Sequence, residues 1–219
     1  MEKKTLILCD LDDTIFRTDD FLRRVLVALS ELDHGDLADK IRQDIAKLRA
    51  KSGTSAGYPL DEKIAPFAEP LTEILKGGNN KMIFPDARDF VQKLPDDAQF
   101  FIFTRGEEIY QNLKLTGTIL ADAEEYPREI FPEQDKIARF LDEITVGEGG
   151  FTFQGNFYKE VVFVDNDGCY FTGFARLGRA GINACGFLVH HQNPRFILPP
   201  DDELPTGVKS VADFSQVEI

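Results

Sequence analysis

Three short apolar runs along the chain each end in a polar residue. The runs are residues 6–9, 100–103 and 161–164, and the polar residues that follow them are Asp10, Thr104 and Asp165. Uninterrupted apolar runs of this kind are typical of strands buried on both faces of a parallel sheet. Ligands of such sheets bind outside the carboxyl ends of the strands, so the pattern predicts that these three side chains share one binding edge.

Segments with helical periodicity lie between the runs. The predicted helices, each with one apolar face, cover residues 21–32, 37–48, 70–77, 85–94 and 136–144. Buried strands that alternate with helices predict an α/β fold with a parallel sheet and right-handed crossovers. Residues 17–82 are mainly helical and have the character of an insert. The segment 145–158, rich in Gly and Phe, is expected to be a long loop or a small hairpin.

Composition and charge limit the possible partners. With 42% hydrophobic and 29% charged residues, the chain has the apolar content of a globular protein. Its formal net charge of −13 argues against a nucleic-acid partner and against an anionic membrane surface. The three cysteines lack metal-ligand spacing, and no stretch approaches the roughly eighteen apolar residues of a membrane span. We therefore expect a cytoplasmic protein.

The first apolar run leads into an acidic motif, Asp10-Leu11-Asp12-Asp13-Thr14. Carboxylates this close repel one another unless a cation or a partner relieves the repulsion. Asp-rich turns also occur for structural reasons, because Asp accepts backbone hydrogen bonds and caps helices. The preceding apolar run and Thr14 make this pattern more specific. It resembles the first motif of the haloacid dehalogenase (HAD) superfamily, which implies that Asp10 is the nucleophile and Asp12 the general acid/base.

The second run resembles the next motif of that superfamily. There an apolar strand ends in Thr or Ser, which hydrogen-bonds the transferring phosphoryl group, and Thr104 occupies this position. Thr104 is equally suited to cap a helix beginning near Glu107, and the two roles are compatible. Arg105 follows directly and is a candidate contact for an anionic substrate, although a solvated arginine is the more common arrangement.

The third motif of the superfamily is a single lysine. Lys136 opens a predicted helix upstream of the last apolar run, as the superfamily lysine does, although the usual Lys-Pro pair is absent. Lys159 competes for the role because it directly precedes that run. A lysine in such a place is more often a solvated residue at a strand edge, so we favour Lys136.

The third run resembles the fourth motif, whose first Asp binds the metal. In this chain that residue is Asp165, and Asn166 stands where the common form has a second Asp. Asn accepts a contact from a metal or a water without supplying charge, so the second role is left open between Asn166 and Asp167. His190 and His191 follow a later predicted strand, and we expect them to be exposed loop residues because adjacent strand residues face opposite sides.

The resemblance covers the chain outside the insert and implies a Rossmann-like parallel sheet core, residues 1–16 and 83–219. Residues 17–82 would be an all-helical cap that excludes water and shapes the leaving-group pocket. The resemblance further implies Mg²⁺ as the cofactor. Its candidate ligands are Asp10, Asp165, the backbone carbonyl of Asp12, and Asn166.

The implied activity is hydrolysis of a small phosphorylated metabolite through an aspartyl-phosphate on Asp10, with Thr104, Lys136 and Arg105 against the phosphate. A phosphomutase shares every motif and stays an alternative. A haloacid dehalogenase lacks the second acid, so Asp12 argues against that activity. A catalytically weak binding protein is a further alternative because of Asn166. The sequence predicts no oligomeric state.

Overall fold

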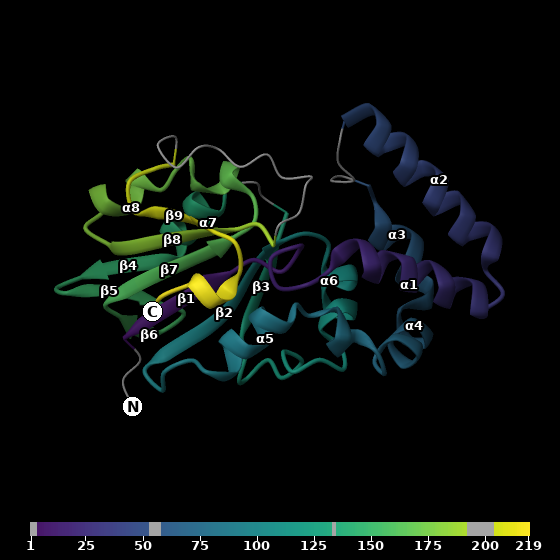
Figure 1. Ribbon diagram of the computed structural model, residues 1–219, viewed down its shortest axis with the longest axis horizontal. Coiled ribbons are helices and arrows are strands. Elements are labelled where there is room, and N and C mark those ends of the chain that lie inside the picture. Colours follow the sequence, from purple (N-terminus) through teal and green to yellow (C-terminus); the bar gives the residue numbers. More distant parts are fainter. Residues whose placement is uncertain (1–3, 53–57, 133–134, 192–203) are drawn as a thin grey trace. The chain divides into compact units, whose positions relative to one another are not determined.

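The computed structural model describes residues 4–52, 58–132, 135–191 and 204–219 (Figure 1). The chain forms two compact units. We call residues 1–16, 84–105 and 123–219 the core unit, and residues 17–83 and 106–122 the helical unit. No helix within the described ranges is long and apolar enough to cross a membrane.

The core unit is built on a six-stranded sheet in the order β3-β2-β1-β7-β8-β9, in which every neighbouring pair is parallel. The strands are β1 (Thr5–Cys9), β2 (Ala98–Arg105), β3 (Arg128–Phe131), β7 (Glu160–Asp165), β8 (Asn183–Val189) and β9 (Val208–Val211). This confirms the predicted Rossmann-like α/β fold. In register, Cys9 of β1 pairs with Ile102 of β2 and Val164 of β7, so all three strands end at the same edge.

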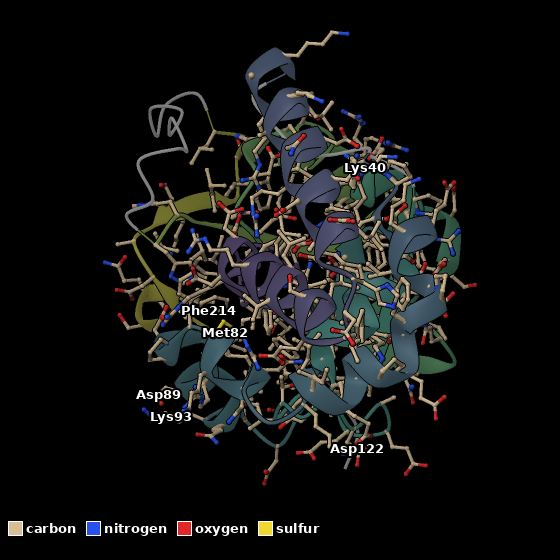
Figure 2. The ribbon with its side chains drawn as sticks, turned by 90° about the vertical axis from the view of Figure 1, so that its right-hand side faces the viewer. Lys40, Met82, Asp89, Lys93, Asp122 and Phe214 are labelled. Carbon is tan, nitrogen blue, oxygen red and sulfur yellow. The ribbon has the colours of Figure 1, made fainter. Side chains whose placement is uncertain are left out.

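Helices and short turns precede, separate or follow these strands in the core unit. They are α5 (Pro85–Gln92), α7 (Lys136–Glu143), η3 (Gly168–Phe171), α8 (Ala175–Arg179) and η5 (Phe214–Gln216). Ile137 and Phe140 of α7 and Leu177 of α8 belong to a buried cluster that includes alternate residues of β1, β2 and β7. At the surface, Asp89 of α5 forms an ion pair at 3.7 Å with Lys93, the residue that directly follows the helix (Figure 2).

The segment rich in Gly and Phe forms a second, antiparallel sheet, which agrees with the hairpin alternative and adds a third strand. Its strands are β4 (Ile144–Gly147), β5 (Gly150–Phe153) and β6 (Asn156–Tyr158), in the order β4-β5-β6. Phe151 and Phe153 are buried and Thr152 between them is half-buried, because successive strand residues face opposite sides. The Phe153 ring packs edge-on against Phe101 of β2, with ring centroids 5.2 Å apart.

The helical unit contains α1 (Thr18–Glu31), α2 (Gly35–Ser52), α3 (Leu60–Ile64), η1 (Ala65–Phe67), α4 (Ala68–Leu75), η2 (Asn79–Met82) and α6 (Glu108–Leu115). The apolar stripe of α1 is buried, as its periodicity predicts. The unit also contains residues 106–122, which the sequence motifs predict to belong to the core.

Reciprocal capping between α3 and α6 explains this different boundary. The Asp61 carboxylate accepts hydrogen bonds from the backbone N–H groups of Ile109 at 2.7 Å and Tyr110 at 2.8 Å. In return, Glu107 Oε2 accepts one from the backbone N–H of Asp61 at 2.8 Å. These bonds satisfy N–H groups in the first turns of both helices, which lack partners within a helix. Helix α6 is therefore joined to α3 by polar contacts that no local pattern reveals.

Asn79 caps the other end of α6, where backbone carbonyl groups lack partners within the helix. It is fully buried, and its amide nitrogen donates to the carbonyl oxygens of Leu113 at 2.7 Å and Thr116 at 2.9 Å. Its side-chain oxygen accepts a hydrogen bond from Arg24 Nη1 at 2.8 Å. One buried amide thus joins α1, η2 and the carboxyl end of α6.

We predict that Asn79→Ala destabilises the protein by about 1–3 kcal/mol, because it leaves buried carbonyl groups without their donor. The measurement is the free energy of unfolding in urea, followed by far-UV circular dichroism. The control is Asn112→Ala on α6 itself, a half-buried position where the change should stay within about 0.5 kcal/mol. Equal effects of the two substitutions would contradict the bridging role of Asn79.

Candidate active site

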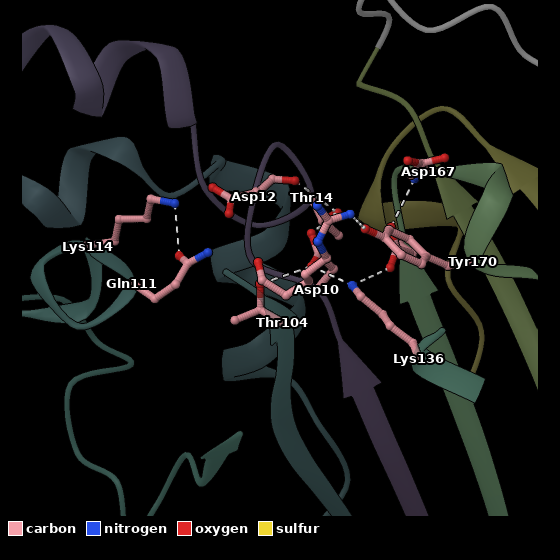
Figure 3. Close-up of polar contacts among 11 residues, drawn as sticks. Asp10, Asp12, Thr14, Thr104, Gln111, Lys114, Lys136, Asp167 and Tyr170 are labelled. Carbon is pink, nitrogen blue, oxygen red and sulfur yellow. Dashed lines mark hydrogen bonds and ion pairs between the residues drawn. The ribbon is translucent and has the colours of Figure 1, made fainter. Parts of the chain in front are cut away.

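The carboxyl ends of β1, β2 and β7 bring the three predicted polar residues together, and Figure 3 labels two of them, Asp10 and Thr104. Asp10 directly follows β1, and its backbone N–H donates to the carbonyl of Val164 on β7 at 2.9 Å. Thr104 Oγ1 donates to Asp10 Oδ1 at 3.1 Å. Asp10, Thr104 and Asp165 are all buried. The common edge exists because parallel strands in register end side by side.

Lys136 completes this cluster from the first position of α7. Its Nζ lies 2.5 Å from Asp10 Oδ1 and 2.6 Å from Asp165 Oδ2, and only 3% of its side chain is exposed. The Asp135 carboxylate caps the helix by accepting from the backbone N–H of Ala138 at 2.8 Å. The alternative, Lys159, is exposed and precedes β7, at the opposite end of that strand. Lys136 is therefore the lysine that the fold places beside Asp10.

The cluster combines two buried carboxylates with one buried ammonium group. Burial, together with the charge of Asp10, raises the pKa of Asp165 to about 7, although Lys136 opposes this shift. Burial alone would lower the pKa of Lys136, but the attraction of Asp10 and Asp165 outweighs it and raises that pKa. With both carboxylates ionised, the three groups carry one net negative charge. Such a site attracts a cation.

Asp12 lies in a tight turn that follows Asp10. The backbone N–H of Asp13 donates to the carbonyl of Phe16 at 2.8 Å, and Asp13 has a φ of 53° in the left-handed region. Thr14 Oγ1 is 3.2 Å from Asp10 Oδ2 and 3.5 Å from the carbonyl oxygen of Asp12. Thr14 therefore connects the turn to Asp10. The side chain of Asp12, a residue of the same turn, is half-buried.

The structure gives the contacts of Asp167, which follows Asn166. The Asp167 carboxylate caps η3 by accepting from the backbone N–H of Cys169 at 2.9 Å, and its own backbone N–H donates to Asp165 Oδ1 at 2.9 Å. Its side chain thus has a structural role. Asn166, 9% exposed, directly follows Asp165 and is the better candidate for a metal or water contact.

Two further residues near the cluster differ from what the sequence predicts: Tyr170 is not marked by any motif, and His191 is placed wrongly. Tyr170 of η3 places its ring 4.4 Å from Lys136 Nζ, and its hydroxyl lies 3.5 Å from Arg105 Nη1. Burial raises the pKa of the Tyr170 phenol. The second residue is His191, for which the prediction of an exposed loop residue is wrong, because only 8% of its side chain is exposed.

Metal binding can be judged from the donor set. Within the described residues, no three His, Cys, Asp or Glu side chains gather into a complete metal-binding group. Asp10 and Asp165 nevertheless present buried carboxylate oxygens, and the carbonyl of Asp12 lies in the adjoining turn. Mg²⁺ commonly takes one or two carboxylates and keeps several waters. The donor set and its excess negative charge are compatible with a hard cation of this kind.

Comparison with known proteins shows the fold. No protein-family model and no curated protein sequence matches this chain. A haloacid dehalogenase-like hydrolase from Burkholderia xenovorans LB400 matches with a TM-score of 0.61 and 15% identity, over 97% of this chain and 94% of that one. The HAD-hydrolase YfnB from Bacillus subtilis, solved bound to magnesium, matches with a TM-score of 0.54 and 14% identity, over 98% and 96%.

A 2-haloacid dehalogenase from Pseudomonas syringae pv. Tomato DC3000 also matches, with a TM-score of 0.50 and 17% identity, over 99% of this chain and 96% of that one. These matches span nearly the whole chain at low sequence identity. The chain therefore has the fold of the haloacid dehalogenase-like hydrolases, as its motifs suggested.

We predict that Lys136→Met lowers the free energy of unfolding by about 3–5 kcal/mol at neutral pH, because two buried carboxylates lose their cation. The loss should shrink in acid, where protonation of a carboxyl removes the repulsion. Urea denaturation across a pH series measures it. The control is Lys93→Met, whose side chain is 76% exposed and whose loss should be near zero. An equal, pH-independent loss in both variants would contradict the charge argument.

Proposed function

We propose that the protein is a Mg²⁺-dependent phosphatase that hydrolyses a small phosphomonoester through an aspartyl-phosphate intermediate on Asp10. The observation that carries this proposal is the buried cluster of Asp10, Lys136, Asp165 and Thr104 at the carboxyl end of β1. A second carboxylate, Asp12, lies two residues further along. The helical unit is our candidate for the inserted cap of this superfamily.

The chemistry uses the two carboxylates of the turn in sequence. An oxygen of Asp10 attacks phosphorus, the bond to the leaving oxygen breaks, and Asp12 gives that oxygen its proton. Asp12 then accepts a proton from water, whose oxygen attacks phosphorus and releases phosphate from Asp10. Splitting the displacement in this way restores both carboxylates at the end of the cycle.

The charge that develops on the phosphoryl oxygens requires donors and cations. Lys136 and Thr104 supply donors beside Asp10, and Arg105 is a further candidate for contact with the anionic substrate. Mg²⁺ held by Asp10, Asp165, the carbonyl of Asp12 and Asn166 would reduce the repulsion between the carboxylates and the phosphate. Asp10 is kept oriented by the hydroxyl groups of Thr104 and Thr14.

Dehalogenation of a 2-haloacid is the second candidate, because the chain shares its fold with a 2-haloacid dehalogenase at a TM-score of 0.50. Asp12 argues against it, since a proton donor is needed for an alkoxide leaving group and not for a halide ion. A phosphomutase uses the same first step and differs in what accepts the phosphoryl group. Product analysis separates the three: inorganic phosphate, halide, or a rearranged phosphoester.

We predict turnover of p-nitrophenyl phosphate and of some member of a panel of phosphorylated metabolites in the presence of Mg²⁺. Activity should disappear in EDTA and return when excess Mg²⁺ is added. The same panel includes 2-haloacids, with halide release as the readout. Phosphatase activity that survives complete metal removal would exclude the role of Mg²⁺, and halide release without phosphate release would favour the dehalogenase.

A further prediction separates Asp10 from Asp12. Asp10→Asn should form no phosphoenzyme, whereas Asp12→Asn should form it from p-nitrophenyl phosphate, whose leaving group departs without a proton. On alkyl phosphates Asp12→Asn should be slower by about 10²–10⁴-fold, the usual contribution of general acid catalysis. Single-turnover rates on both substrates measure this difference.

The control is Asp13→Asn, the same substitution in the same turn, at a left-handed position that Asn tolerates. It should change neither rate appreciably. Equal losses of Asp12→Asn on the two substrates would mean that Asp12 acts through charge or position and transfers no proton.

A further inference from the structure

The turn that carries Asp12 is held from outside by a histidine. His191, two residues beyond the end of β8, has its Nε2 2.7 Å from the carbonyl oxygen of Thr14. A carbonyl oxygen only accepts, so Nε2 must carry the hydrogen and donate it. The contact joins residues 177 positions apart in the sequence, both of them in the core unit.

The imidazole ring is itself fixed in place. It stacks on Phe84 with ring centroids 3.7 Å apart and an interplanar angle of 12°. Its Nδ1 lies 3.5 Å from Asp86 Oδ2, an oxygen that also accepts the backbone N–H of Phe214 at 2.9 Å. His191 has a φ of 44°, a left-handed conformation in which His is enriched among non-glycine residues. The ring therefore has one orientation, and that orientation directs Nε2 at the turn.

Phe84 contributes a second anchor to the same turn. Its backbone N–H donates to the carbonyl of Ile15 at 2.9 Å, directly next to the carbonyl that His191 holds. Two consecutive carbonyl groups of the turn, those of Thr14 and Ile15, are thus bound by a stacked pair of residues. From the other side, the Thr14 hydroxyl is within hydrogen-bond distance of Asp10 Oδ2 and the carbonyl of Asp12.

We infer that His191 is a positioning residue that orients Asp12 by fixing the carbonyl of Thr14. This inference rests on the proposed function, in which Asp12 transfers the proton. Asp10 follows a buried central strand and contacts Lys136 and Thr104, so it depends on His191 only through the one contact that it shares with Thr14, at 3.2 Å. Loss of the His191 bond should therefore impair the proton transfer of Asp12 and spare the attack by Asp10.

The test uses three substitutions of His191 that differ in reach. His191→Gln places an amide nitrogen at the same number of bonds from Cα as Nε2, so it can donate to Thr14. His191→Asn matches Nδ1 instead and falls short, although Asn tolerates the left-handed backbone well. His191→Phe keeps the stacking on Phe84 and removes the donor. The control is His190→Phe, the same change at the adjacent, half-buried position.

The readout is the single-turnover rate of phosphoenzyme formation at saturating substrate. His191→Phe and His191→Asn should lose about tenfold to a hundredfold on an alkyl phosphate, the scale of a misplaced catalytic group. Their loss on p-nitrophenyl phosphate should be several times smaller, with KM unchanged. His191→Gln should recover most of the rate, and His190→Phe should match the wild type. Equal losses on both substrates, or no recovery with Gln, would overturn the inference.

Amide hydrogen exchange keeps the inference testable if the proposed function fails. If the wild type turns over no phosphoester, the proposed phosphatase function is wrong, but the inference that His191 holds the turn can still be tested. His191→Phe should still accelerate exchange at the amides of Asp13 and Phe16, which hydrogen-bond within the core unit, relative to those of β1. His191→Gln should restore protection. Unchanged exchange in His191→Phe would show that His191 does not hold the turn.

Discussion

The ammonium group of Lys136 between Asp10 and Asp165 is the interaction on which the core unit depends. The two carboxylates come from the ends of adjacent parallel strands and are almost fully buried, so each needs a partner. Lys136 reaches both from the first turn of α7, and Phe140 of the same helix lies in the apolar cluster against the sheet. Packing of α7 therefore sets the position of the Lys136 ammonium group. The positive charge of that group offsets the cost of burying the two carboxylates.

A buried ion cluster of this kind is weak evidence for stability, because replacement by apolar groups is often neutral or favourable. The buried ion cluster is better explained as preorganisation of the candidate active site. Lys136 and Thr104 both donate to Asp10 Oδ1, so two donors lie beside the carboxylate that we propose as the nucleophile. With both carboxylates ionised, the same arrangement carries an excess negative charge, which fits the cation of the proposed mechanism.

The features that could be predicted from the sequence are those with a local pattern of apolar and polar residues. β1, β2 and β7 appear as apolar runs, and the polar residue after each run marks the common edge. The sequence favours Lys136 over Lys159 because Lys136 opens a helix upstream of the last apolar run, and the structure puts it beside Asp10. Contacts between residues far apart in the sequence could not be predicted. The capping of α6 by Asp61 joins residues 48 and 49 positions apart, and His191 meets Thr14 across 177 positions. Neither contact has a spacing that a reader of the sequence can recognise.

The central place of β1 also has a consequence for how the chain folds. Its neighbours are β2, beyond the inserted helices, and β7, which begins at Glu160. A nascent chain therefore leaves one edge of β1 unpaired until β7 has been made, although β2 is available earlier to pair with the other edge. Sheets with such non-local contacts fold slowly and expose unpaired edges on the way. The strand that leads into Asp10 therefore acquires its second neighbour only after the helical unit and the β4-β5-β6 sheet have been synthesised.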